Sequence, residues 1–159
     1  MGFLTGAFLK MYTTRMRIQL QHQLTTVTMR QNRITKQIGD MEKKITQMKQ
    51  AATMGVSSNM QMANAEAASI FQTAAASGDA NAMTTANVNY QNTLAMNAMN
   101  AQMTKSLIEQ QFEQMSEAQL EPLKNMEEQL AMEKANLESR IKLIEGQEQA
   151  SREMEKSSQ

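Results

Sequence analysis

The sequence predicts an all-α protein of long antiparallel helices, a helical hairpin or coiled-coil-like bundle that is elongated rather than globular. Apolar side chains recur three and four residues apart over long stretches, a spacing that brings them to one side of an α-helix. The composition also favours helix, because Gln, Glu, Met, Ala and Lys dominate while Val, Phe, Tyr and Trp are scarce. Finally, basic and acidic residues are divided between the two ends of the chain.

Residues 1–54 are expected to form a long basic amphipathic helix. From Leu20 to Ala52 the residues of an apolar seam recur at alternating intervals of four and three, which is the seven-residue repeat of a coiled coil. Gln31 is the one polar residue of this seam. So narrow a stripe must pack against another helix, in the same chain or in a neighbouring copy. The residues predicted to form this packing seam are Leu20, Leu24, Val27, Ile34, Ile38, Met41, Ile45 and Met48.

An apolar N-terminal extension precedes this seam. The sequence predicts that it contacts a neighbouring subunit through Phe3, Leu4, Phe8 and Leu9. The alternative is that residues 1–18, which also carry three basic side chains, lie on a membrane surface. No apolar run approaches the ~20 residues of a membrane span. The start also lacks the charged region and small-residue cleavage site of a signal peptide.

Residues 55–104 are expected to form a helical middle that is rich in Ala, Asn and Met and uncharged apart from Glu66 and Asp79. A break is expected at residues 55–59, where a glycine is followed by candidate helix-capping residues. A second interruption is expected at Gly78, as the residue that follows a helix, and at Asp79, as the N-cap of the next. We interpret the rest as closely packed helix, in preference to a partly disordered linker.

Residues 105–159 are expected to form an acidic amphipathic helix with a frayed tail after Gly146. Pro122, the only proline, either begins a new helix here or kinks a continuous one. The predicted packing residues in this segment lie seven apart and are Leu123, Leu130, Leu137 and Ile144.

The distribution of charged residues predicts that the two ends of the chain pack against each other. Residues 1–50 carry nine basic and two acidic side chains, whereas residues 105–159 carry seven basic and twelve acidic ones. We therefore expect the ends to pair, within one chain or across subunits. The predicted partners are Arg30, Arg33, Lys36, Lys43 and Lys44 on the basic side and Glu109, Glu113, Glu117 and Glu121 on the acidic side. The other possibility is that these carboxylates are simply solvated.

No residue pattern points to catalysis, a cofactor or a metal, so a non-enzyme is predicted. The chain has no Cys, and its only His, His22, has no partner residue nearby in sequence. The methionines at 96, 99 and 103 share a helical face, which favours core packing over a soft-metal site. Nucleic acid is not the expected partner of the basic half, since that half lacks interleaved aromatic residues and an acidic half is present to neutralise it.

These features favour a structural subunit that assembles with copies of itself into a filament, tube or similar structure. The alternatives are a coiled-coil adaptor or secretion-chaperone-like module that forms a dimer or small oligomer, and a peripheral membrane protein. The layout of helical ends around a distinct middle is similar to that of axial filament proteins of flagellar and type III secretion systems. The acidic C-terminal end differs from the apolar end of flagellins. The absence of cysteine, which is common among exported bacterial structural proteins, favours an exported or extracellular assembly.

Overall fold

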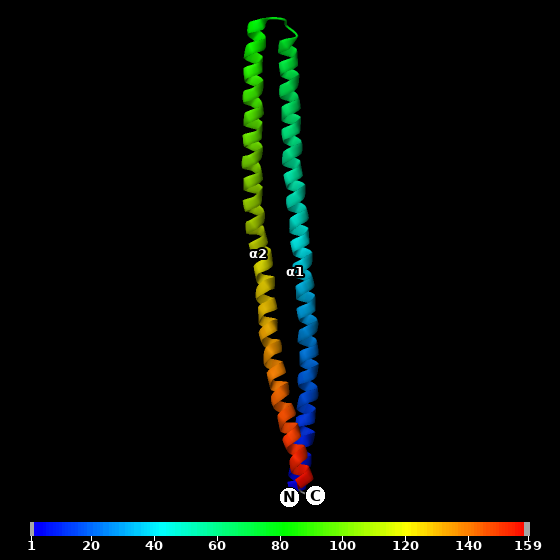
Figure 1. Ribbon diagram of the computed structural model, residues 1–159. Helices are drawn as coiled ribbons and strands as arrows, with labels where there is room; N and C mark the ends of the chain where they lie inside the picture. The colour runs from blue at the N-terminus through cyan, green and yellow to red at the C-terminus, as the bar shows by residue number, and fades with distance from the viewer. Residues whose placement is uncertain (1, 158–159) are drawn as a thin grey trace. The chain divides into compact units, whose positions relative to one another are not determined.

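The computed structural model describes residues 2–157, apart from the side chain of Phe3. Two α-helices account for almost all of this range: α1 (Gly2–Ala75) and α2 (Ala80–Ser157). The chain divides into unit 1, which contains residues 1–40 and 120–159, and unit 2, which contains residues 41–119. In each unit a stretch of α1 packs antiparallel against a stretch of α2, as Figure 1 shows. The predicted all-α fold of long antiparallel helices is therefore confirmed.

The turn between the helices follows the capping chemistry expected at Gly78 and Asp79. The φ angle of Gly78 is 76°, in the left-handed region that glycine adopts without steric cost. The Asp79 carboxylate accepts a hydrogen bond from the backbone N–H of Asn81 at 3.1 Å, and this satisfies one of the first free donors of α2. The chain reverses within four residues as a result.

The break expected at residues 55–59 is wrong, because α1 continues through Gly55 to Ala75. A glycine inside a helix costs only about 1 kcal/mol relative to alanine. Packing against α2 opposes that cost, since Val56 and Met60 are half-buried. Pro122 lies inside α2, so it does not begin a helix, and α2 also continues past Gly146 to Ser157.

Unit 1 has a core with a seven-residue repeat. Leu20 and Val27 of α1 pack with Leu137 and Ile141 of α2. Partly buried leucines and an isoleucine complete this cluster, namely Leu24, Leu130 and Ile144. Repeats of seven residues keep the packed side of both helices in contact when the pair supercoils in a left-handed sense.

Unit 2 follows an eleven-residue repeat instead. On α1 the least exposed positions include Ile45, Val56 and Ala67, each eleven residues after the last, and on α2 they include Tyr90, Ala101 and Phe112. Eleven residues in three turns give 3.67 residues per turn, which favours straight or right-handed packing. The core is thin because many of its residues are Ala, Asn or Thr, and its main aromatic contact is the stack of Phe71 on Tyr90, with ring centroids 5.4 Å apart.

Candidate helix-packing and interaction surfaces

Most of the predicted seam residues lie on the sides of α1 and α2 that face each other within a unit. Those that are buried are Leu20, Val27, Ile34, Ile38, Ile45 and Leu137. Those that are half-buried are Leu24, Met41, Leu123, Leu130 and Ile144. Met48 differs from the rest because it is exposed.

Charged residues occupy part of the α2 seam, which the sequence analysis missed. One line of this seam runs at seven-residue intervals through Leu120, Glu127, Lys134, Ile141, Glu148 and Glu155. Three of its carboxylates contact α1: Glu127 accepts a hydrogen bond from Thr35 at 3.1 Å, Glu148 contacts Arg17 at 2.9 Å, and Glu155 contacts Lys10 at 3.7 Å. Extending the seven-residue spacing from Ile141 finds these positions, provided that charged residues are allowed on the seam.

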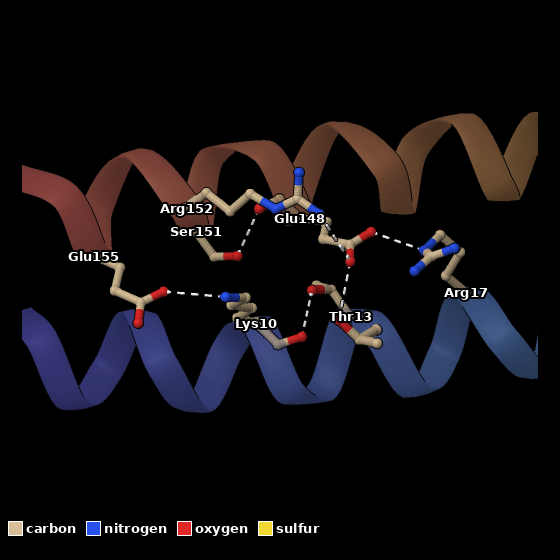
Figure 2. Close-up of polar contacts among 8 residues, drawn as sticks. Lys10, Thr13, Arg17, Glu148, Ser151, Arg152 and Glu155 are labelled. Carbon is tan, nitrogen blue, oxygen red and sulfur yellow. Dashed lines mark hydrogen bonds and ion pairs between the residues drawn. The ribbon is translucent and has the colours of Figure 1, made fainter.

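Glu148 is the most enclosed of these carboxylates, and Figure 2 shows its contact with Arg17. Glu148 is 5% exposed, and its carboxylate accepts hydrogen bonds from the Thr14 hydroxyl and the Arg17 Nε, both at 2.9 Å. Arg152 lies one turn along α2, with its Nη2 3.7 Å from the same carboxylate. The Thr14 hydrogen bond lowers the pKa of Glu148 most, burial opposes it, and the contact with Arg17 lowers it further. The charged form is thus favoured in the folded chain.

The two helices also approach each other closely at Gly6, beside Ser151 and Glu155. A Cβ atom added to Gly6 would lie 3.1 Å from the backbone nitrogen of Glu155 and 3.4 Å from the carbonyl oxygen of Ser151. The side chains of Thr13 and Ser151 have no solvent exposure, and each hydroxyl donates to a carbonyl three residues earlier in its own helix. Small residues therefore permit this approach, and their polar atoms are satisfied locally.

The predicted charge pairing is not made within the chain as expected. Lys49 contacts Glu109 at 3.6 Å, but it was not among the five predicted basic partners. Among residues 2–157 no ion pair forms between Arg30, Arg33, Lys36, Lys43 or Lys44 and Glu109, Glu113, Glu117 or Glu121. The antiparallel register explains part of this, because Thr35 lies beside Glu127 and so Arg30 and Arg33 lie opposite later residues of α2. Pairing between subunits stays a prediction.

A second row of side chains runs along α1 on the side away from α2 in unit 1. We call it the outer α1 row; its members are spaced four and three apart and are Leu4, Phe8, Met11, Arg15, Ile18, His22, Thr25 and Met29. Its five large apolar residues are between 58% and 75% exposed. Of the predicted subunit contacts, Leu4 and Phe8 belong to this row and Leu9 is half-buried, whereas the Phe3 side chain lies outside the described part of the chain.

Unit 2 carries a comparable row on α2, again on the side away from its partner helix. We call it the methionine row; it consists of Val88, Met96, Met99, Met103 and Leu107. The interpretation of its three methionines as core residues is wrong for the isolated chain, because they are 60–64% exposed. The predicted helical face is real, but α2 packs through its opposite side, at Leu94, Asn97 and Ala101.

The outer α1 row borders an open groove in unit 1. The groove has a volume of about 560 Å³. It is lined by Ala7, Lys10, Met11, Thr14, Arg15, Ile18, Gln19 and Glu155. Its apolar walls and its few charges suit a side chain of another protein surface better than a reaction, since it holds no pairing of nucleophile and base.

Within residues 2–157, no group of three or more His, Cys, Asp or Glu side chains is placed to hold a metal ion. None of the helices in that range has a stretch apolar enough to cross a membrane. No family model, curated protein or solved structure matches this chain.

Proposed function

We propose that this chain is a structural subunit that assembles with copies of itself into a filament, tube or similar supramolecular structure. The observation that carries this proposal is the outer α1 row, which repeats the coiled-coil spacing on the side of α1 away from α2. A helix with apolar residues on two opposite sides is suited to packing between two partners. The chain supplies one partner in α2, and a neighbouring copy would supply the other.

The methionine row supports the same proposal from unit 2. Monomeric proteins rarely expose long contiguous apolar patches, and those that do generally use them for binding. Four of the five residues in this row lie within a span of twelve residues of α2, from Met96 to Leu107, so they form one continuous strip. Methionine adapts its shape to its neighbours, which suits repeated contacts between copies.

Charged side chains without an ion-pair partner in the chain would determine how two copies orient when they make these apolar contacts. Arg30, Arg33 and Lys36 have no carboxylate partner among the described residues, and neither do Glu113 and Glu117. Surface pairs contribute only about 0–1 kcal/mol each, so their role would be to select partner and orientation. Assembly should therefore weaken as salt is raised, and assembly that is indifferent to salt would remove the charge component of this proposal.

Light scattering and negative-stain microscopy of the purified protein test the proposal directly. We expect large particles of regular form above a threshold protein concentration. The double variant Phe8→Gln/Ile18→Gln should raise that threshold, because it removes apolar area from the outer α1 row while keeping residues that favour helix. The matched control Gln21→Ala, at an exposed position outside the row, should leave it unchanged. A protein that stays monomeric at every concentration contradicts the proposal.

An adaptor or chaperone-like binding module is the second candidate function. The observation in its favour is the methionine row, since flexible methionine-rich surfaces bind partners of varied sequence. A defined dimer or small oligomer that stops growing with concentration would favour this candidate over the filament.

A further inference from the structure

The charge around the outer α1 row limits what can cover it. Residues 2–39 contain six basic side chains and no acidic one. Lys10 and Arg17 are paired with carboxylates of α2, whereas Arg15 has no such partner among the described residues. Arg30 and Arg33 are in the same situation as Arg15. The row is therefore poorly suited to contact the same row of a second copy, because like charges brought together oppose association.

An outer row of different character runs along α2 in the same unit. We call it the outer α2 row; it lies on the side away from the seam and consists of Met132, Asn136, Ser139, Leu143, Gly146, Ala150 and Glu153. Met132 is 67% exposed and Leu143 is 64% exposed. A Cβ atom added to Gly146 would meet nothing within 4 Å, so the space over this row is open.

The outer α2 row lacks the basic excess of the outer α1 row and complements it in size. Residues 120–157 carry nine acidic and six basic side chains. Glu153 lies on the outer α2 row and Glu128 and Glu133 lie beside it, and none of them has an ion pair among the described residues, although Arg140 and Lys142 also lie beside the row. The outer α1 row begins with bulky side chains, whereas the later part of the outer α2 row is mainly small. Bulky residues that face small ones allow two helices to interdigitate.

We propose that the outer α1 row of one copy packs against the outer α2 row of a second copy, through unit 1 of each. This inference rests on the proposed function and specifies the contact that would build the assembly. It repeats between copies the basic-on-acidic pairing that unit 1 already uses internally, where Arg17 contacts Glu148 and Lys10 contacts Glu155. The two surfaces differ, so the contact is heterologous: one copy retains a free outer α2 row and the other a free outer α1 row, and both can bind further copies.

An anionic membrane is a weaker partner for the outer α1 row. Each basic residue near an anionic lipid surface contributes about 1 kcal/mol. Within residues 2–18, Lys10 and Arg17 are already paired with Glu155 and Glu148, which leaves Arg15 as the unpaired cation. Over residues 2–18 this single unpaired charge supplies little attraction to lipid, whereas the regular four-and-three spacing, which continues to Met29, matches a helical partner.

Cysteine cross-linking tests the contact, because the natural chain contains no cysteine. The α1-row variants are Ile18→Cys and Met29→Cys, and the α2-row variants are Leu143→Cys and Met132→Cys. Each variant is incubated alone, under mild oxidation with copper phenanthroline. The four possible mixtures of one α1-row variant with one α2-row variant are incubated under the same conditions. We expect at least one mixture to give several-fold more disulfide-linked dimer than either of its components alone. Ile18→Cys mixed with Met103→Cys, in the methionine row, is the matched control and should stay at background.

The outcomes separate this inference from the proposed function. The inference is overturned if the protein forms large assemblies but none of the four mixtures gives more disulfide-linked dimer than its components alone. In that case the proposed function still stands. Strong cross-linking of Ile18→Cys with itself also overturns the inference, because the outer α1 row would then meet its own kind. If the protein proves strictly monomeric, both this inference and the proposed function are contradicted. Binding of that monomer to phosphatidylglycerol vesicles, lost in Phe8→Gln, would assign the row to a membrane surface instead.

Discussion

Replacing Gly6 by alanine is expected to destabilise unit 1, although alanine is the better helix former. Helix propensity alone favours the substitution by about 1 kcal/mol. The new Cβ atom, however, would lie 3.1 Å from the backbone nitrogen of Glu155, closer than normal van der Waals contact. That neighbour is backbone and cannot rotate away, and overpacking of this kind costs about 1–3 kcal/mol. The expected net effect is a loss of about 0–2 kcal/mol in the free energy of unfolding.

Gly39→Ala is the matched control, since Gly39 lies in the same helix and the same unit, and a Cβ atom there meets nothing within 4 Å. It should stabilise the chain by about 1 kcal/mol. The two variants should therefore differ by about 1–3 kcal/mol. Urea unfolding followed by circular dichroism measures the difference, at one protein concentration because assembly shifts apparent stability. Amide hydrogen exchange over residues 9–20 assigns the effect to unit 1. Equal stabilisation by both alanines would refute the close approach at Gly6.

Four further substitutions, one of them with a matched control, test the packing and the charge of unit 1. The folded-state pKa of Glu148 is lowered from its ordinary value of 4.5, so its carboxylate stabilises the fold above that pH and loses this contribution as the pH falls below it. Glu148→Gln should flatten the acid limb of a stability–pH curve, whereas Glu145→Gln, at an exposed position, should not. Leu137→Ala should cost about 2–5 kcal/mol of unfolding free energy in thermal or urea unfolding, because the side chain is buried in the core. Leu143→Ala should stay within about 0.5 kcal/mol in the monomer while weakening assembly. Pro122→Ala should raise the melting temperature, since proline inside a helix costs about 3 kcal/mol. An unchanged melting temperature would mean that α2 already accommodates the missing hydrogen bond.

The helices and their turn could be predicted from the sequence because local chemistry determines both. The seam from Leu20 to Ile45 consists, apart from Gln31, of large apolar residues at coiled-coil spacing, and Gly78 with Asp79 supplies both caps of the turn. The continuity of α1 through Gly55 could not be predicted in this way. There the local preference for helix is weak, and contacts with α2, which lies far away in sequence, support the segment.

The polar part of the seam was missed for a related reason. Glu148 and Arg17 occupy seam positions but are charged, and a search for apolar periodicity passes over them. Their role becomes visible only when the antiparallel register places one beside the other. The exposed methionines show the converse limit, because spacing identifies the face on which Met99 and Met103 lie but does not say whether this chain covers that face.

The two repeat lengths restrict how either helix can be lengthened or shortened. In unit 2, adding eleven residues to each arm returns every side chain to its original direction, whereas in unit 1 the permitted step is seven. Adding a single residue rotates everything beyond it by about 100°, which would move apolar residues out of the seam and place charged ones in it. Both arms must also change together, or carboxylates such as Glu148 lose their partners on α1. Such a chain can therefore vary in span only in discrete, matched steps.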